Sequence, residues 1–119
     1  AGTTVWIDDE ARMDAVTAVS GSGPAYVFLL AAAMEDAAVA QGLPPADART
    51  LVLHTVLGAA RMLVESGQAP AELRRQVTSP GGTTHAAVET VETGGLRVLV
   101  AEAIDKAARR GGELSAAND

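Results

Sequence analysis

The feature that most constrains the fold is a run of residues, 15–34, that contains no charged side chain. Its second half, residues 25–34, reads AYVFLLAAAM and is apolar on every face of a helix. A helix that is apolar all round is buried on all sides. A single chain of 119 residues has few other elements with which to surround it. We therefore expect a second subunit to cover this helix.

The length of the uncharged run also raises the question of a membrane span. The sequence SGSGP at residues 20–24 would interrupt a spanning helix at its middle, and Glu35 and Asp36 follow directly. This pattern predicts two soluble helices joined at a turn. The first residues lack the basic start and long apolar stretch of a secretory signal. We expect a cytoplasmic protein without a membrane partner.

Composition narrows the classes of function. Hydrophobic residues make up 48% of the chain, yet Phe, Tyr and Trp occur once each, so Ala, Val and Leu must build the core. The net charge of −6 and the lack of a basic run argue against a nucleic-acid partner. The chain has no cysteine, and its two histidines, His54 and His85, are too few and too far apart to suggest a metal site.

Capping and stop residues predict an all-α fold of about six helices. Glycines at 21, 42, 67, 94 and 111 suit helix ends. The tail from Gly112 to Asp119 is predicted to be disordered. Residues 3–7 form a short β-like run without a partner later in the chain, so we expect it to belong to a sheet of another domain or subunit. The expected helices span residues 9–19, 22–41, 46–65, 70–76, 80–93 and 96–110.

The stretch QVTSPGGTT at residues 76–84 has the composition of a ligand site. Ser79 suits an N-cap and Pro80 suits the first helical position, so a helix is predicted to begin there. Gly81 and Gly82 then leave the backbone of the first turn bare. The unpaired N–H groups and the positive dipole end of a helix start attract a carboxylate or phosphate. The alternative is an ordinary capped helix with a flexible entry.

Three segments together resemble the pyrroline-5-carboxylate reductase family: DAVTAVSGSGPAY at 14–26, TVLGAA at 55–60 and QVTSPGGTT at 76–84. The resemblance covers essentially the whole chain but only the C-terminal half of that enzyme. It implies an intertwined dimerisation domain of the 6-phosphogluconate dehydrogenase C-terminal type, and so a homodimer or a higher oligomer. On this view residues 1–7 end a linker or strand from an N-terminal nucleotide-binding domain, and residues 8–119 form the helical dimerisation and substrate-binding domain.

The family reduces the cyclic imine of pyrroline-5-carboxylate to L-proline, in proline biosynthesis, with hydride from NADPH or NADH. The resemblance implies that backbone N–H groups around Gly81, Gly82 and Thr83 hold the substrate carboxylate. It also implies that the Thr84 hydroxyl meets the ring nitrogen. A positioned hydroxyl can relay the proton that this nitrogen gains, which makes Thr84 the candidate catalytic residue.

The same resemblance implies that Glu10 lies beside the substrate ring, that Ser79 belongs to the substrate site and that Gln76 faces the cofactor. The cofactor itself would be bound mainly by the N-terminal domain, which this sequence does not contain. The residues alone leave simpler alternatives open. Glu10 is equally a first-turn acid, Ser79 a cap and Gln76 an exposed helix end.

Three functions remain open at this point. The first is the C-terminal domain of an imine reductase, inactive without its nucleotide-binding domain. The second is a stand-alone helical dimerisation module without catalysis. The third is a β-hydroxyacid dehydrogenase relative, which would be expected to have a lysine acid/base on a central helix. Lys106, the only lysine, lies near the C-terminus, which favours the first function over the third.

Overall fold

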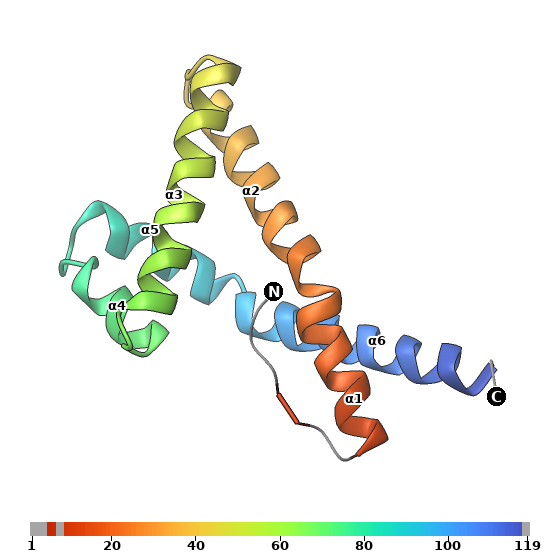
Figure 1. Cartoon of the computed structure of the whole chain (residues 1–119). Coiled ribbons are helices and arrows are strands. Elements are labelled where there is room, and N and C mark those ends of the chain that lie inside the picture. Colours follow the sequence, from red (N-terminus) through yellow and green to blue (C-terminus); the bar gives the residue numbers. More distant parts are fainter. Residues whose placement is uncertain (1–4, 7–8, 118–119) are drawn as a thin grey trace. The chain divides into compact units, whose positions relative to one another are not determined.

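The computed structural model describes residues 5–6 and 9–117, with the backbone alone for Ala11. All regular structure in these residues is helical (Figure 1), which confirms the predicted all-α fold. Val5 and Trp6 belong to no regular element and are exposed, and the rest of the expected strand lies outside the described residues. The elements are α1 (Glu10–Val16), the π-helix η1 (Thr17–Gly21), α2 (Gly23–Ala40), α3 (Pro45–Glu65), α4 (Pro70–Gln76), α5 (Thr83–Thr93) and α6 (Leu96–Ala117).

The chain divides into two compact units. The first consists of Ala1–Tyr26 and Gly95–Asp119, and the second of Val27–Gly94. The first unit therefore contains α1, η1, the start of α2, and α6. The second contains the rest of α2 together with α3, α4 and α5.

In the first unit, α1 and η1 both pack against α6. The backbone N–H of Ser22 donates to the Thr17 carbonyl at 2.9 Å, a bond that reaches five residues back and defines the π-helix. Ala18 within this turn is fully buried. The Tyr26 hydroxyl donates to the Ala18 carbonyl at 2.8 Å, so a side chain from α2 stabilises the π-helix η1.

The predicted turn at residues 20–24 is wrong, because the helical path continues through it. Only Ser22 lies outside the helices, and its φ of −87° and ψ of −21° are still helical. Pro24 falls in the first turn of α2, where its missing N–H costs nothing. The resulting helical run, Arg12–Ala40, is long and apolar enough to cross a membrane by length and composition alone. A single run of this kind is weak evidence, since core helices of soluble proteins have the same composition.

The predicted end of the last helix at Gly111 is also wrong, as is the predicted disorder over residues 112–117; residues 118–119 lie outside the described residues. α6 continues through Gly111 and Gly112 to Ala117. The reason is a tertiary contact with α1. A Cβ on Gly112 would lie 3.1 Å from the Asp14 Oδ2 atom, and one on Gly111 would lie 3.7 Å from Oδ1. The two glycines allow α1 to approach the backbone of α6 closely, and they do not end α6.

In the second unit, α2 and α3 diverge from a short connection at residues 41–44 (Figure 1). Gly42 has a φ of +103° and so forms the predicted left-handed helix stop. Near this connection Ala48 and Val52 of α3 are buried. The Arg49 Nε atom lies 2.6 Å from Glu35 Oε1 and joins the two helices.

Away from this connection the apolar helices are uncovered. No residue of α2 is buried, and Phe28 and Leu29 are 71% and 72% exposed. Among the described residues, only Ala18, Ala48 and Val52 are buried hydrophobic residues. One chain therefore does not supply the cover that the apolar run at 25–34 requires, as its sequence indicates.

Candidate functional site

The candidate site begins at the end of α4. This helix spans Pro70–Gln76, as predicted, with Pro70 at its first position. Arg75 forms an ion pair with Glu72 one turn earlier on the same helix. The guanidinium lowers the pKa of the Glu72 carboxyl by this hydrogen bond and by its charge. This arginine is thus engaged within its own helix.

A tight turn then leads from α4 to α5. The Gly82 N–H donates to the Ser79 carbonyl at 3.1 Å, which closes a four-residue turn. Pro80 and Gly81 occupy its central positions, and the φ of +73° at Gly81 is the left-handed value that the third position of a type II turn requires. Pro followed by Gly is the preferred sequence for such a turn.

The turn shifts the predicted start of α5. The helix begins at Thr83 and not at Pro80, so Ser79 is not its N-cap. Gly82 holds the N-cap position with φ −85° and ψ −178°, and no side chain caps the helix. The prediction was wrong because Pro80-Gly81 favours the type II turn over a first helical turn.

Gly82 differs from Gly81 in what its backbone requires. Its φ is open to any residue, and an added Cβ would meet only the Ser79 carbonyl oxygen at 3.4 Å and the Ser79 Cβ at 3.6 Å. These are ordinary contacts. Neither conformation nor packing within the chain demands a glycine here, and a bare backbone is what a close-approaching ligand needs.

The start of α5 presents unpaired donors. The N–H groups of Thr83, Thr84 and His85 have no carbonyl four residues earlier within the helix. Within the described part of the chain, the hydroxyls of Thr83 and Thr84 make no hydrogen bond, whereas those of Thr78 and Thr90 each donate to a carbonyl four residues back. The positive end of the helix dipole adds to these donors. The arrangement can bind an anion through backbone amides, with free hydroxyls beside it.

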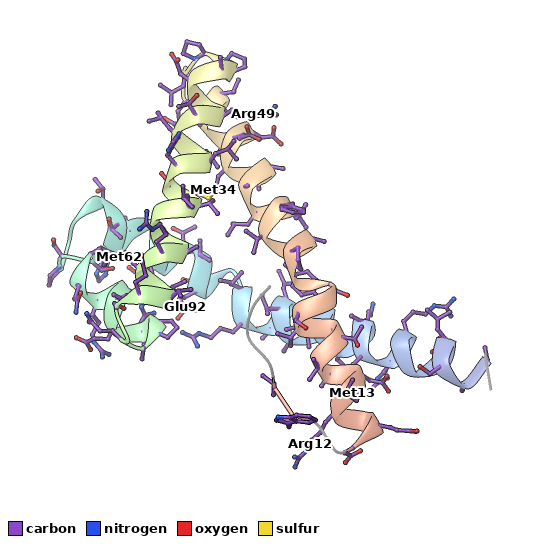
Figure 2. All side chains as sticks on the ribbon, viewed as in Figure 1. Arg12, Met13, Met34, Arg49, Met62 and Glu92 are labelled. Carbon is purple, nitrogen blue, oxygen red and sulfur yellow. The ribbon has the colours of Figure 1, made fainter. Side chains whose placement is uncertain are left out.

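Gln76 is the exposed last residue of α4. Its Nε2 donates to the Gln68 Oε1, so the two amides form a pair beside the turn. A largely apolar hollow of about 290 Å³ lies between α3 and α4, and Figure 2 labels Met62 on its α3 side. The hollow is lined by Ala59, Met62, Leu63, Pro70, Leu73, Arg74, Gln76 and Val77.

Glu10 is the exposed first residue of α1. It belongs to the first unit, whereas the turn at 79–82 belongs to the second. Its role beside the substrate therefore stays a prediction. Among the described residues, no group of three or more His, Cys, Asp or Glu side chains is placed to hold a metal ion.

Sequence reasoning missed Arg74 and Glu92. The Arg74 Nη1 atom lies 3.5 Å from Glu92 Oε2, which joins the last turn of α4 to the last turn of α5. The two residues are 18 positions apart, so no helical spacing could have indicated this pair. Arg74 also lines a second hollow, of about 280 Å³, together with Arg75, Thr78, His85, Val88 and Glu89.

Comparison with known proteins identifies a matching family and similar proteins. A family model described as pyrroline-5-carboxylate reductase dimerisation matches residues 10–114. The pyrroline-5-carboxylate reductase of Pseudomonas aeruginosa is 54% identical over 114 residues, which cover 96% of this chain and 42% of that protein. The chain thus spans about two fifths of the length of this relative.

Two solved structures are similar in fold. A pyrroline-5-carboxylate reductase from Coxiella burnetii superposes with a TM-score of 0.91 at 45% identity, over 95% of this chain and 42% of that one. The pyrroline carboxylate reductase of Plasmodium falciparum, solved with NADP bound, has a TM-score of 0.81 at 35% identity, over 87% of this chain and 39% of that one.

An all-α domain with uncovered apolar helices, matched by a dimerisation model over most of its length, is a dimerisation domain. The chain belongs to the pyrroline-5-carboxylate reductase family. The resemblance found in its sequence motifs is thereby confirmed.

Proposed function

We propose that this chain is the C-terminal domain of a pyrroline-5-carboxylate reductase and binds the carboxylate of 1-pyrroline-5-carboxylate at the start of α5. In the whole enzyme the imine would be reduced to L-proline. The observation that best supports the proposal is Gly82, a bare residue that neither its φ nor its neighbours require, placed directly before unpaired helix amides.

The turn itself determines which amides serve the ligand. The Gly82 N–H already donates to the Ser79 carbonyl, so the substrate carboxylate would accept from the N–H groups of Thr83 and Thr84. Gly81 shapes the turn, Ser79 closes it, and Gly82 leaves room for the ligand. Each residue of the predicted substrate site thus has a distinct proposed role.

Thr84 is the proposed proton-handling residue. Its half-buried side chain lies on the first turn of α5, and its hydroxyl makes no hydrogen bond within the described residues. In a substrate whose carboxylate is held by the adjacent amides, the ring nitrogen would lie near this hydroxyl. The hydroxyl would donate to the nitrogen as it gains a proton. Glu10 would add a carboxylate beside the ring.

The proposed cofactor is NADPH or NADH, which supplies the hydride when bound. Its main binding site would lie on an N-terminal nucleotide-binding domain. Gln76 fits a supporting role, because it lines the apolar hollow between α3 and α4 and its amide offers both a donor and an acceptor. The chain alone would therefore not reduce the imine.

We also propose that the protein acts in the cytoplasm as a homodimer, with α2 and α3 of each subunit covered by the other. The uncovered apolar faces of these helices and the matched dimerisation model support the dimer. The run at 12–40 is then a subunit core helix and not a membrane span. Higher assembly of dimers is a further step of this proposal.

The proposal is tested by titrating the 119-residue chain with L-proline and following backbone amides by NMR. We expect shifts centred on Thr83 and Thr84, and no imine reduction by the chain with either nucleotide. The Gly82→Val variant should fold but lose these shifts. A dimer that folds well and shows no shift near the turn would instead support a dimerisation module without substrate binding.

A further inference from the structure

Arg74 connects the candidate site to the far end of α5 through two different groups. Its backbone carbonyl accepts the Thr78 hydroxyl at 2.5 Å, at the point where the chain leaves α4 for the turn. Its guanidinium lies 3.5 Å from the Glu92 carboxylate, in the last turn of α5. One residue therefore contacts both the entry to the turn and the end of the helix that follows it.

This placement bears on the direction of α5. The helix has 11 residues and so extends about 16 Å. Its first turn follows α4 through residues 77–82, and its last turn is joined to α4 by the ion pair. A helix held at both ends keeps one direction relative to α4, whereas a helix held at one end can rotate about that end. Figure 2 labels Glu92 on this element.

We propose that Arg74 is a positioning residue for the carboxylate site: its ion pair with Glu92 fixes the direction of α5 and thereby aims the Thr83 and Thr84 amides at the ligand. This inference rests on the proposed function. Arg74 need not touch the substrate. Loss of the pair should weaken carboxylate binding while leaving the chemical step, which depends on Thr84, nearly unchanged.

The size of the effect follows from exposure. The Arg74 and Glu92 side chains are 39% and 36% exposed, so solvent screens their attraction. Exposed ion pairs contribute up to about 1 kcal/mol, which corresponds to roughly a 5-fold change in an equilibrium constant. In a full-length enzyme that carries this domain, Arg74→Gln should raise KM for the imine about 3- to 5-fold and change kcat less than about 2-fold.

Arg75 provides a matched control on the same helix. It is the adjacent arginine, and its partner Glu72 lies within α4, so its pair does not reach α5. Arg75→Gln should leave KM unchanged. The charge-exchanged double variant Arg74→Glu with Glu92→Arg should recover most of the lost affinity, whereas each single reversal should not. The KM advantage of the parent over Arg74→Gln should also shrink at high ionic strength.

The Gly82→Val variant distinguishes failure of the positioning role of Arg74 from failure of the proposed carboxylate site. If Gly82→Val abolishes carboxylate binding but Arg74→Gln behaves like the parent, the positioning role is overturned and the site stands. If Gly82→Val leaves KM unchanged, the turn is not the carboxylate site and both proposals fail. Equal losses from Arg74→Gln and Arg75→Gln, without rescue by charge exchange, would also overturn the positioning role.

Discussion

At the scale of single residues, the threonine hydroxyls fall into two groups. Those of Thr55, Thr78 and Thr90 donate to carbonyls four residues back, which satisfies them locally. Those of Thr83 and Thr84, like those of Thr17 and Thr50, make no such bond within the described residues. A hydroxyl without a local partner beside unpaired amides is available to a ligand.

Thr84 gives the first prediction. In a full-length enzyme carrying this domain, Thr84→Ala should lower kcat/KM by roughly 10²-fold, the lower range for a positioned proton-transfer group. Thr84→Ser should keep most activity because it retains the hydroxyl. Thr90→Ala on the same helix is the control and should leave kcat/KM unchanged. Parent-like rates for both Thr84 variants would show that the hydroxyl has no chemical role.

The two glycines of the turn give the second prediction, because they are glycine for different reasons. At Gly81 the φ of +73° should make Gly81→Ala cost about 1–2 kcal/mol of stability. At Gly82 the φ of −85° allows a side chain, so Gly82→Ala should be nearly neutral for the fold yet weaken L-proline binding. Denaturant unfolding and NMR titration of both variants measure this. The reverse pattern would contradict the roles assigned to the two residues.

At the scale of elements, the contact between α1 and α6 decides where α6 ends. Glycine usually weakens a helix interior by about 1 kcal/mol relative to alanine. α6 nevertheless passes through Gly111 and Gly112, because Asp14 of α1 approaches its backbone there. The packing of one helix against another thus outweighs a local stop signal.

The two glycines of α6 give the third prediction. Gly111→Ala should raise the free energy of unfolding by roughly 0.5–1 kcal/mol, because its Cβ would meet Asp14 Oδ1 at an ordinary 3.7 Å. Gly112→Ala should gain less or lose stability, because its Cβ would lie 3.1 Å from Oδ2 and the carboxylate would have to move. Urea denaturation compares them. Equal gains at both positions would mean that Asp14 does not constrain α6.

At the scale of the whole molecule, the number of buried hydrophobic residues is too small for a stable monomer. Only three of the described hydrophobic residues are buried, while Phe28, Leu29 and Leu57 are more than half exposed. A chain of 119 residues normally buries well over half of its unfolded surface. The missing burial must come from outside the described residues, and we propose that a second subunit supplies it.

The fourth prediction concerns this assembly. Sedimentation of the chain at micromolar concentration should show a dimer that buries more than ~2,000 Å² in total. Leu29→Asp should yield dissociated or unfolded protein, because a charge would enter the subunit core. Asp36→Asn, on the same helix but outside the apolar run, should remain dimeric. A folded monomer of the parent chain would overturn the obligate dimer.

The sequence by itself determined the class of fold and the family. Apolar runs, and the Pro and Gly residues that begin and end helices, are local signals. They predicted α4 without error and α3 to within one residue. The three motifs predicted the family that the comparisons confirmed. The composition of residues 76–84 predicted a ligand site, and the unpaired donors at the start of α5 are consistent with that prediction.

Only the tertiary structure decided what happens where local signals compete. Gly111 suits a helix stop, and the approach of Asp14 kept α6 intact. Arg74 reaches Glu92 across 18 positions. Local sequence specifies which conformations a segment can adopt, whereas contacts between segments distant in the chain select among them.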